Sequence, residues 1–255
     1  MPLPWWKNVE GLKKLKTLEF KPGFNLLVGP NGSGKTTLLK SLARLFLCET
    51  SGFPIISENS LYALTHEIKS VLDRHVPKGL EASHDGQPVF YYSPDRVHGI
   101  DMFGQLDYDT GAEGLNFMLD VKELSSGNTR ISSLMMTVEM AKNKDFVVKD
   151  GMGDVNQVWT KWKTDAQAFY KASIPAGPRT LLLDEPERSL DVVNQMKLLG
   201  FMAKILAPEF QIIVSSHNPM ALYLPKVHCV ELEEGYAQKC KDAFEQAGFG
   251  LKKPK

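Results

Sequence analysis

The 255-residue sequence predicts an α/β fold built on a mostly parallel central sheet. Two observations indicate this fold. Short apolar strands alternate with amphipathic helical segments, as they do where parallel strands are joined by helical crossovers. A glycine-rich loop also follows the first clear strand and leads directly into an apolar helix. We expect the whole chain, residues 1–255, to form one domain around this sheet.

The expected elements follow from hydrophobic periodicity and turn residues. A loose alternation over residues 12–20, before a Lys-Pro-Gly turn at 21–23, predicts a hairpin with the strand that follows. The expected strands are residues 24–28, 88–93, 180–184 and 211–215. The expected helices are residues 35–48, 58–76, 128–141, 158–172, 192–206 and 219–223, and the Gly- and Asp-rich residues 98–116 are expected to be loop.

Composition excludes several classes of function. The 30 basic residues balance the 30 acidic ones, so a strongly basic overall footprint for nucleic acid is absent, although a local basic face is compatible with this balance. Because there is no run of about 18 apolar residues, we expect no membrane-spanning segment. The N-terminal sequence lacks the apolar stretch of a signal peptide. The three cysteines and six histidines show no metal-ligand spacing, which predicts reduced thiols, a cytoplasmic protein and no protein-ligated transition metal.

A phosphate-binding loop is the strongest motif. "GPNGSGKTT" matches G-x-x-x-x-G-K-[ST] between an apolar strand and an apolar helix. Such a loop wraps backbone amides around a phosphate at a helix N-terminus. Lys35 is expected to bridge the β- and γ-phosphates, and the Thr36 hydroxyl to ligate Mg²⁺. The expected nucleotide contacts are Gly29, Pro30, Asn31, Gly32, Ser33, Gly34, Lys35, Thr36 and Thr37.

Two later strands end in residues suited to phosphoryl chemistry. "TLLLDEPERSLD" ends an apolar strand in two acids, and the carboxyl ends of parallel strands lie beside such a loop. Asp184 is expected to hold Mg²⁺ through water, and Glu185 to orient and deprotonate the attacking water. "QIIVSSHNP" ends a strand in His217, which could hydrogen-bond the γ-phosphate. Lys35, Glu185 and His217 are therefore the expected catalytic residues.

Together with "LSSGN" at 124–128, these motifs resemble, in content and order, the nucleotide-binding domain of the ABC ATPase superfamily. "LSSGN" resembles the L-S-G-G-Q signature, "SLD", which ends at Asp191, resembles the D-loop, and His217 resembles the switch histidine. The resemblance implies a P-loop NTPase fold of the ABC-ATPase type, with an N-terminal antiparallel β part and a helical signature subdomain. The expected parts are a nucleotide-binding core (1–57 and 176–235), a helical signature region (58–141), an accessory insertion (142–178) and a C-terminal tail (236–255).

In that superfamily the signature acts across a dimer. The resemblance implies that two copies pack head to tail around two ATP molecules and Mg²⁺, with Ser125, Ser126 and Gly127 contacting the γ-phosphate held by the other copy. A helix N-terminus with free amides and serine hydroxyls is an anion site, although a plain helix cap is the alternative reading. Asp191 is expected to contribute to the same nucleotide site.

The chain departs from the superfamily pattern in three places. Ser126 and Asn128 stand where glycine and glutamine are usual. "SPDR" at 93–96 occupies the position of the Q-loop glutamine, so Asp95 is a candidate substitute as a metal or water ligand. The stretch between the signature and the acidic strand is longer than in transporter ATPases, which is why residues 142–178 are expected to be inserted.

"DEPERSLD" and "SSHNPMAL" resemble a soluble group of ABC ATPases that includes RecF-like and overcoming-lysogeny-like proteins. This resemblance predicts an ATP-gated clamp or switch in DNA repair or phage defence. It would act with an effector partner such as a nuclease or toxin, and DNA is a candidate ligand. Two alternatives stay open: the ATP-binding subunit of a membrane transporter, and a nucleotide-sensing module with little turnover.

Overall fold

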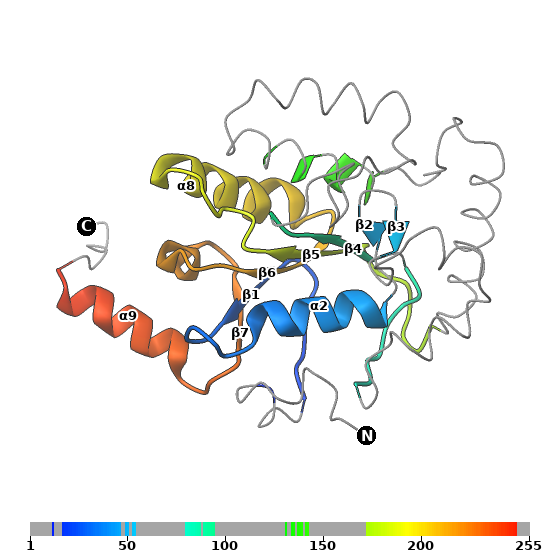
Figure 1. Cartoon of the computed structure of the whole chain (residues 1–255), viewed down its shortest axis with the longest axis horizontal. Coiled ribbons are helices and arrows are strands. Elements are labelled where there is room, and N and C mark those ends of the chain that lie inside the picture. The colour runs from blue at the N-terminus through cyan, green and yellow to red at the C-terminus, as the bar shows by residue number, and fades with distance from the viewer. Residues whose placement is uncertain are drawn as a thin grey trace, which may run out of the picture.

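The computed structural model contains a seven-stranded sheet with the strand order β3-β2-β4-β5-β6-β1-β7 (Figure 1). The pairs β2–β4, β4–β5, β5–β6, β6–β1 and β1–β7 are parallel, and only β2–β3 is antiparallel. The strands are β1 (Phe24–Val28), β2 (Glu49–Thr50), β3 (Phe53–Pro54), β4 (Val89–Tyr92), β5 (Thr180–Asp184), β6 (Gln211–Ser215) and β7 (His228–Glu231). The structure describes residues 12, 17–46, 49–50, 53–54, 80–87, 89–94, 131, 134–135, 137–139, 141–142 and 172–248.

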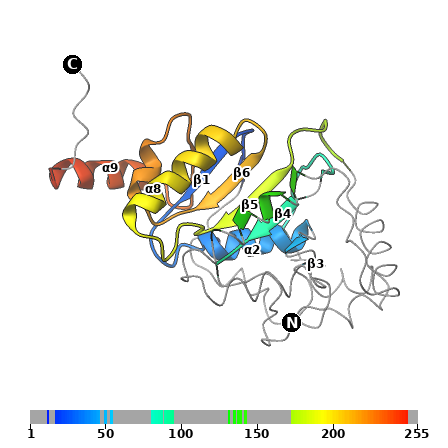
Figure 2. The same ribbon diagram turned by 90° about the horizontal axis from the view of Figure 1, so that it is seen from above.

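Helices cover both faces of this sheet (Figures 1 and 2). The helices are α2 (Lys35–Leu45), α8 (Val192–Phe201) with a π-helical continuation (Met202–Leu206), a 3₁₀ helix (Pro219–Tyr223) and α9 (Tyr236–Gln246). The described positions between 131 and 142 are also helical. Within the described part of the chain, no helix is long and apolar enough to cross a membrane.

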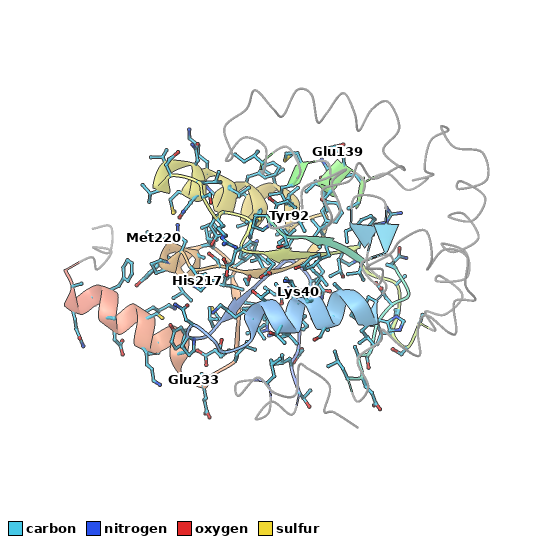
Figure 3. The ribbon with its side chains drawn as sticks, in the orientation of Figure 1. Lys40, Tyr92, Glu139, His217, Met220 and Glu233 are labelled. Atoms are coloured by element: carbon cyan, nitrogen blue, oxygen red, sulfur yellow. The ribbon has the colours of Figure 1, made fainter. Side chains whose placement is uncertain are left out.

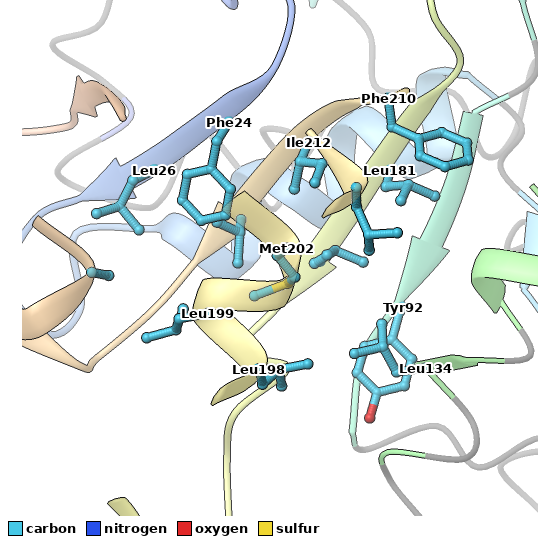
Figure 4. Close-up of a cluster of buried hydrophobic side chains, with 14 of the residues drawn as sticks. Phe24, Leu26, Tyr92, Leu134, Leu181, Leu198, Leu199, Met202, Phe210 and Ile212 are labelled. Atoms are coloured by element: carbon cyan, nitrogen blue, oxygen red, sulfur yellow. The ribbon is translucent and has the colours of Figure 1, made fainter. Parts of the chain in front are cut away.

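Side chains alternate between the two faces along each strand, and this alternation sorts them into two cores. On β5, Leu181 and Leu183 belong to the core under α8, whereas Leu182 belongs to the core over α2. Figure 4 shows the first core, in which Leu199 and Met202 pack against residues of β1, β5 and β6. Strands apolar on both faces form the centre of a three-layer α/β/α fold, which positions the loops at their carboxyl ends.

Most of the strands and helices agree with the sequence predictions. β1, β5, β6 and the 3₁₀ helix have the expected bounds, and the expected helix 35–48 ends three residues earlier, at Leu45. The last turn of the expected helix 192–206 is π-helical, and β4 is shorter than predicted. The predicted helix 58–76, the predicted loop 98–116 and residues 158–171 of the predicted helix 158–172 lie outside the described residues, and residue 172 is not helical.

The predicted hairpin before β1 was wrong for its described part. Residues 17–22 form no strand, because both edges of β1 are already paired in parallel with β6 and β7. Asn25 organises this segment instead, since its buried side chain accepts from Lys21 N (2.8 Å) and donates to Lys21 O (2.7 Å) and Ile212 O (3.0 Å). The antiparallel pairing of the N-terminal region lies at β2–β3. The sequence did not predict β2, β3, β7 or α9.

Candidate nucleotide-binding and catalytic site

The glycine-rich loop closes tightly between β1 and α2. Ser33 N donates to Pro30 O (3.1 Å), and Leu38 N donates to Gly34 O (2.8 Å) at the start of the helix. Gly32 and Gly34 have φ values of +78° and +98°, in the region that favours glycine. A Cβ on Gly29 would lie 2.6 Å from Ser33 Oγ, so no other residue fits there without movement. The loop therefore requires the glycines that the motif supplies.

Lys35 lies inside this loop. Its residue is 6% exposed, and its Nζ donates to the carbonyl oxygens of Gly29 (2.8 Å) and Pro30 (3.2 Å). Burial lowers the pKa of the Lys35 ammonium, while the nearby carboxylates of Glu185 and Asp184 oppose that shift. The loop therefore holds the ammonium through two backbone carbonyl oxygens, and phosphate oxygens could replace these carbonyls as its acceptors.

Asp184, at the end of β5, reaches the first turn of α2. Its Oδ1 accepts from Thr36 Oγ1 (3.0 Å) and from Ser215 Oγ (2.7 Å), and the Tyr91 hydroxyl lies 3.5 Å from its Oδ2. Burial raises the pKa of the Asp184 carboxyl, and the two shorter hydrogen bonds work against that shift. Three strands and one helix thus converge on this carboxylate.

Glu185 and His217 form a pair beside Asp184. His217 Nε2 lies 2.8 Å from Glu185 Oε1. The Glu185 amide donates to Ser215 O (3.1 Å) and Oγ (3.0 Å), which holds Glu185 at φ +48°, an uncommon conformation for a residue other than glycine. Figure 3 shows His217 at the end of the sheet from which α2 starts. The Glu185 and His217 side chains are 24% and 50% exposed, so solvent reaches the pair.

The donor set suits a magnesium nucleotide. Thr36 Oγ1 and the Asp184 carboxylate are hard oxygen donors within 3.0 Å of each other, the ligand type that Mg²⁺ prefers. Ser33 Oγ is buried and has no hydrogen-bond partner among the described residues, which leaves a hydroxyl available at the loop. The loop also offers an ammonium and backbone amides at a helix N-terminus. These residues can hold a phosphate chain and its metal ion.

The structure brings together some of the expected site residues. Gly29 to Thr37 form the loop. Thr36 contacts Asp184, His217 contacts Glu185, and Lys35 lies near enough to both carboxylates for their charges to act on it. Asp191 caps the start of α8, where its Oδ1 accepts from Val193 N (2.9 Å) and Asn194 N (3.0 Å), and its expected role at the nucleotide stays a prediction. Asp95, Ser125, Ser126 and Gly127 lie outside the described residues.

Sequence reasoning missed Ser215, Ser216, Glu187 and Tyr91. Two consecutive serines at the end of an apolar strand are an unusual polar interruption, and that signal could have indicated Ser215 and Ser216. Glu187 was read only as part of the acidic "DEPERSLD" segment. Nothing in the sequence marks the Tyr91 hydroxyl, because a tyrosine in a strand is most simply a core residue.

Two protein families and several known proteins are similar to this chain. A family described as "AAA domain" matches residues 7–87, and a family described as "AAA domain, putative AbiEii toxin, Type IV TA system" matches residues 78–222, more than half of the chain. The manganese transport system ATP-binding protein MntA of Synechocystis sp. is 25% identical over 205 residues, which cover 79% of this chain and 67% of MntA.

Two further proteins are similar to parts or most of this chain. The DNA replication and repair protein RecF of Psychromonas ingrahamii is 37% identical over 78 residues, 29% of this chain and 21% of RecF. The solved dimer of the ATP-binding cassette MJ0796, bound to ADP and Pi, is 17% identical with a TM-score of 0.34 and covers 85% of this chain and 86% of its own. The protein belongs to the family described as "AAA domain, putative AbiEii toxin, Type IV TA system", and it is an ATPase with an ABC-superfamily nucleotide-binding domain.

Proposed function

We propose that this ATPase is an ATP-gated clamp or switch in which two copies close head to tail over two Mg·ATP. The observation that carries the proposal is the convergence of Lys35, Thr36, Asp184, Glu185 and His217 at the carboxyl ends of β1, β5 and β6. Ser125, Ser126 and Gly127 of the opposite copy would cap the γ-phosphate. Since the two sites would share this interface, binding of the γ-phosphate would close one bistable contact, and its loss would open it.

Each described side chain has a distinct part in hydrolysis. Lys35 would exchange its carbonyl acceptors for β- and γ-phosphate oxygens. Thr36 and Asp184 would hold Mg²⁺, which when bound neutralises charge on those phosphates. Glu185 would accept the proton of the attacking water, and His217, 2.8 Å from Glu185, would orient that carboxylate and contact the γ-phosphate.

The relatives favour two biological settings. The family description names a putative toxin of a type IV toxin–antitoxin system, and RecF acts in DNA replication and repair. We propose that this chain acts in DNA maintenance or phage defence, together with an effector such as a nuclease or toxin, and that DNA is a candidate ligand. The alternative is the ATP-binding subunit of a transporter, which the similarity to MntA over 79% of the chain favours.

The test is the solution mass of Glu185→Gln with Mg·ATP and with Mg·ADP, measured by light scattering. We expect turnover to fall by about 10²- to 10⁴-fold, the usual contribution of a general base, with ATP binding retained. The mass should double with Mg·ATP and stay monomeric with Mg·ADP. The matched control is Glu209→Gln, an exposed glutamate before β6, at the amino end of that strand.

Two results would count against the clamp. Undiminished turnover in Glu185→Gln would remove this residue from catalysis. An unchanged mass in Mg·ATP, with ATP binding confirmed by calorimetry, would show that two copies alone do not close. DNA-stimulated turnover would favour the DNA setting, and a membrane-protein partner in a pull-down would favour the transporter alternative.

A further inference from the structure

The buried carboxylate of Glu187 has no part in the site as described so far. The residue is 3% exposed and follows Glu185 by two positions. Its Oε1 accepts from the Ser216 hydroxyl and from the His217 amide at 3.1 Å. Its Oε2 is buried and has no hydrogen-bond partner among the described residues. One oxygen therefore holds the turn after β6, whereas the other bonds to none of the described residues.

Burying a carboxyl group in this position destabilises the folded state. Burial raises the pKa of the Glu187 carboxyl, and the three hydrogen bonds of its surroundings counter that shift only in part. Burying a carboxyl group that is only partly hydrogen-bonded costs free energy that an apolar side chain of similar volume would not, so folding stability alone would favour the apolar residue. The contacts of Oε1 are the feature that an apolar residue cannot supply.

Those contacts lead directly to the catalytic pair. Glu187 binds the backbone amide of His217, and the imidazole of the same residue reaches Glu185 Oε1 at 2.8 Å. Glu185 and Glu187 lie on one short turn, closed by Arg188 N donating to Glu185 O (3.0 Å). The turn thus binds His217 through both its backbone and its side chain. These two contacts fix the imidazole relative to the Glu185 carboxylate, which it must orient.

A second set of hydrogen bonds, which does not involve Glu187, also holds the turn after β6. Asn218 Nδ2 donates to Gln195 Oε1 (2.8 Å), and Gln195 Nε2 donates to Leu190 O (2.9 Å). Asn218 Oδ1 also accepts from Met220 N (2.9 Å) at the start of the 3₁₀ helix. None of these contacts restrains the His217 amide. Loss of Glu187 should therefore loosen His217 while leaving its neighbours in place.

We propose that Glu187 is a positioning residue for His217: its carboxylate anchors the His217 backbone so that the imidazole meets Glu185 and the γ-phosphate. The proposal rests on the proposed function, because it assigns Glu187 to the hydrolytic step. It predicts that Glu187 acts only through His217. The two residues should then be energetically coupled rather than independent.

The experiment is a double-mutant cycle on kcat with Glu187→Ala and His217→Ala. We expect Glu187→Ala to lower kcat by about 10-fold, as the loss of one charge-assisted hydrogen bond would, with ATP affinity unchanged. In the His217→Ala background the same substitution should cause no further loss. Glu187→Gln keeps a carbonyl acceptor and should retain more activity than Glu187→Ala. The control is Glu209→Gln, which is expected to match the wild type.

A second readout needs no turnover. Hydrogen exchange of the His217 amide, followed by NMR in the nucleotide-free protein, should accelerate by about 10-fold in Glu187→Ala. Ser216→Ala, which removes only one of the two donors, is the milder variant if Glu187→Ala does not fold. An equal kcat loss in both backgrounds, or an unchanged His217 amide, would overturn the proposal. A wild-type chain without turnover would instead refute the proposed function, and the exchange measurement would still decide the role of Glu187.

Discussion

Ser215→Ala is the sharpest test of how the site is held together. Ser215 is fully buried at the end of β6, and its hydroxyl donates to Asp184 Oδ1 at 2.7 Å. The same oxygen accepts from the Glu185 amide at 3.0 Å. The substitution removes one hydroxyl and adds no volume, so any effect reports on these contacts.

The expected loss of stability depends on which hydrogen-bond partners of Ser215 keep another bond after the substitution. The Glu185 amide retains Ser215 O at 3.1 Å, so it is not left unsatisfied. Asp184 retains Thr36 but loses its shortest hydrogen bond, and a bond to a charged group contributes roughly 1.5–3 kcal/mol. At about 2–4 °C per kcal/mol for a chain of this size, Tm should fall by roughly 3–12 °C.

The assay is thermal and urea unfolding of Ser215→Ala near neutral pH and near pH 3. Below the ordinary pKa of 3.8 the Asp184 carboxyl is neutral in the folded and unfolded states, so the lost bond should weaken toward the roughly 1 kcal/mol of a neutral one. The control is Ser41→Ala, a buried serine whose hydroxyl donates only to Thr37 O (2.8 Å). A neutral-pH loss no larger than that of Ser41→Ala would refute the reasoning.

Two further predictions concern the charged groups. Lys35→Ala should weaken ATP binding by about 10-fold or more in calorimetry, since it removes the only ammonium expected at the β- and γ-phosphates; wild-type affinity would exclude that role. Asp184→Asn should raise Tm near neutral pH while abolishing turnover. Because burial raises the pKa of Asp184, the wild-type protein loses stability as the pH rises and this carboxyl becomes ionised in the folded state. Asparagine stays neutral and avoids that loss. Below the ordinary pKa of 3.8 the wild-type carboxyl is neutral as well, so the gain in Tm should vanish there in pH-dependent melts.

Local sequence was sufficient for the parts of the site that depend on neighbours along the chain. The strand 24–28, the loop and the start of α2 were predictable together, because glycine spacing and the change from strand to helical periodicity are both local. The bounds of β5 and β6 were predictable for the same reason. The ends of helices were less predictable from the sequence, because the π-helical turn after Phe201 depends on packing against the sheet.

The sequence by itself determined the chemistry at the strand ends: a phosphate loop, two acids and a histidine, each read from a contiguous motif. Only the tertiary structure decided what holds them. Ser215 lies 31 residues from Asp184, and Ser216 lies 29 from Glu187, so these hydrogen bonds form only when β5 and β6 pair in register. The same holds for β7, whose pairing with β1 took the edge that a hairpin would have used. A motif specifies which atoms are present, but the distance between atoms on different strands is set by the sheet.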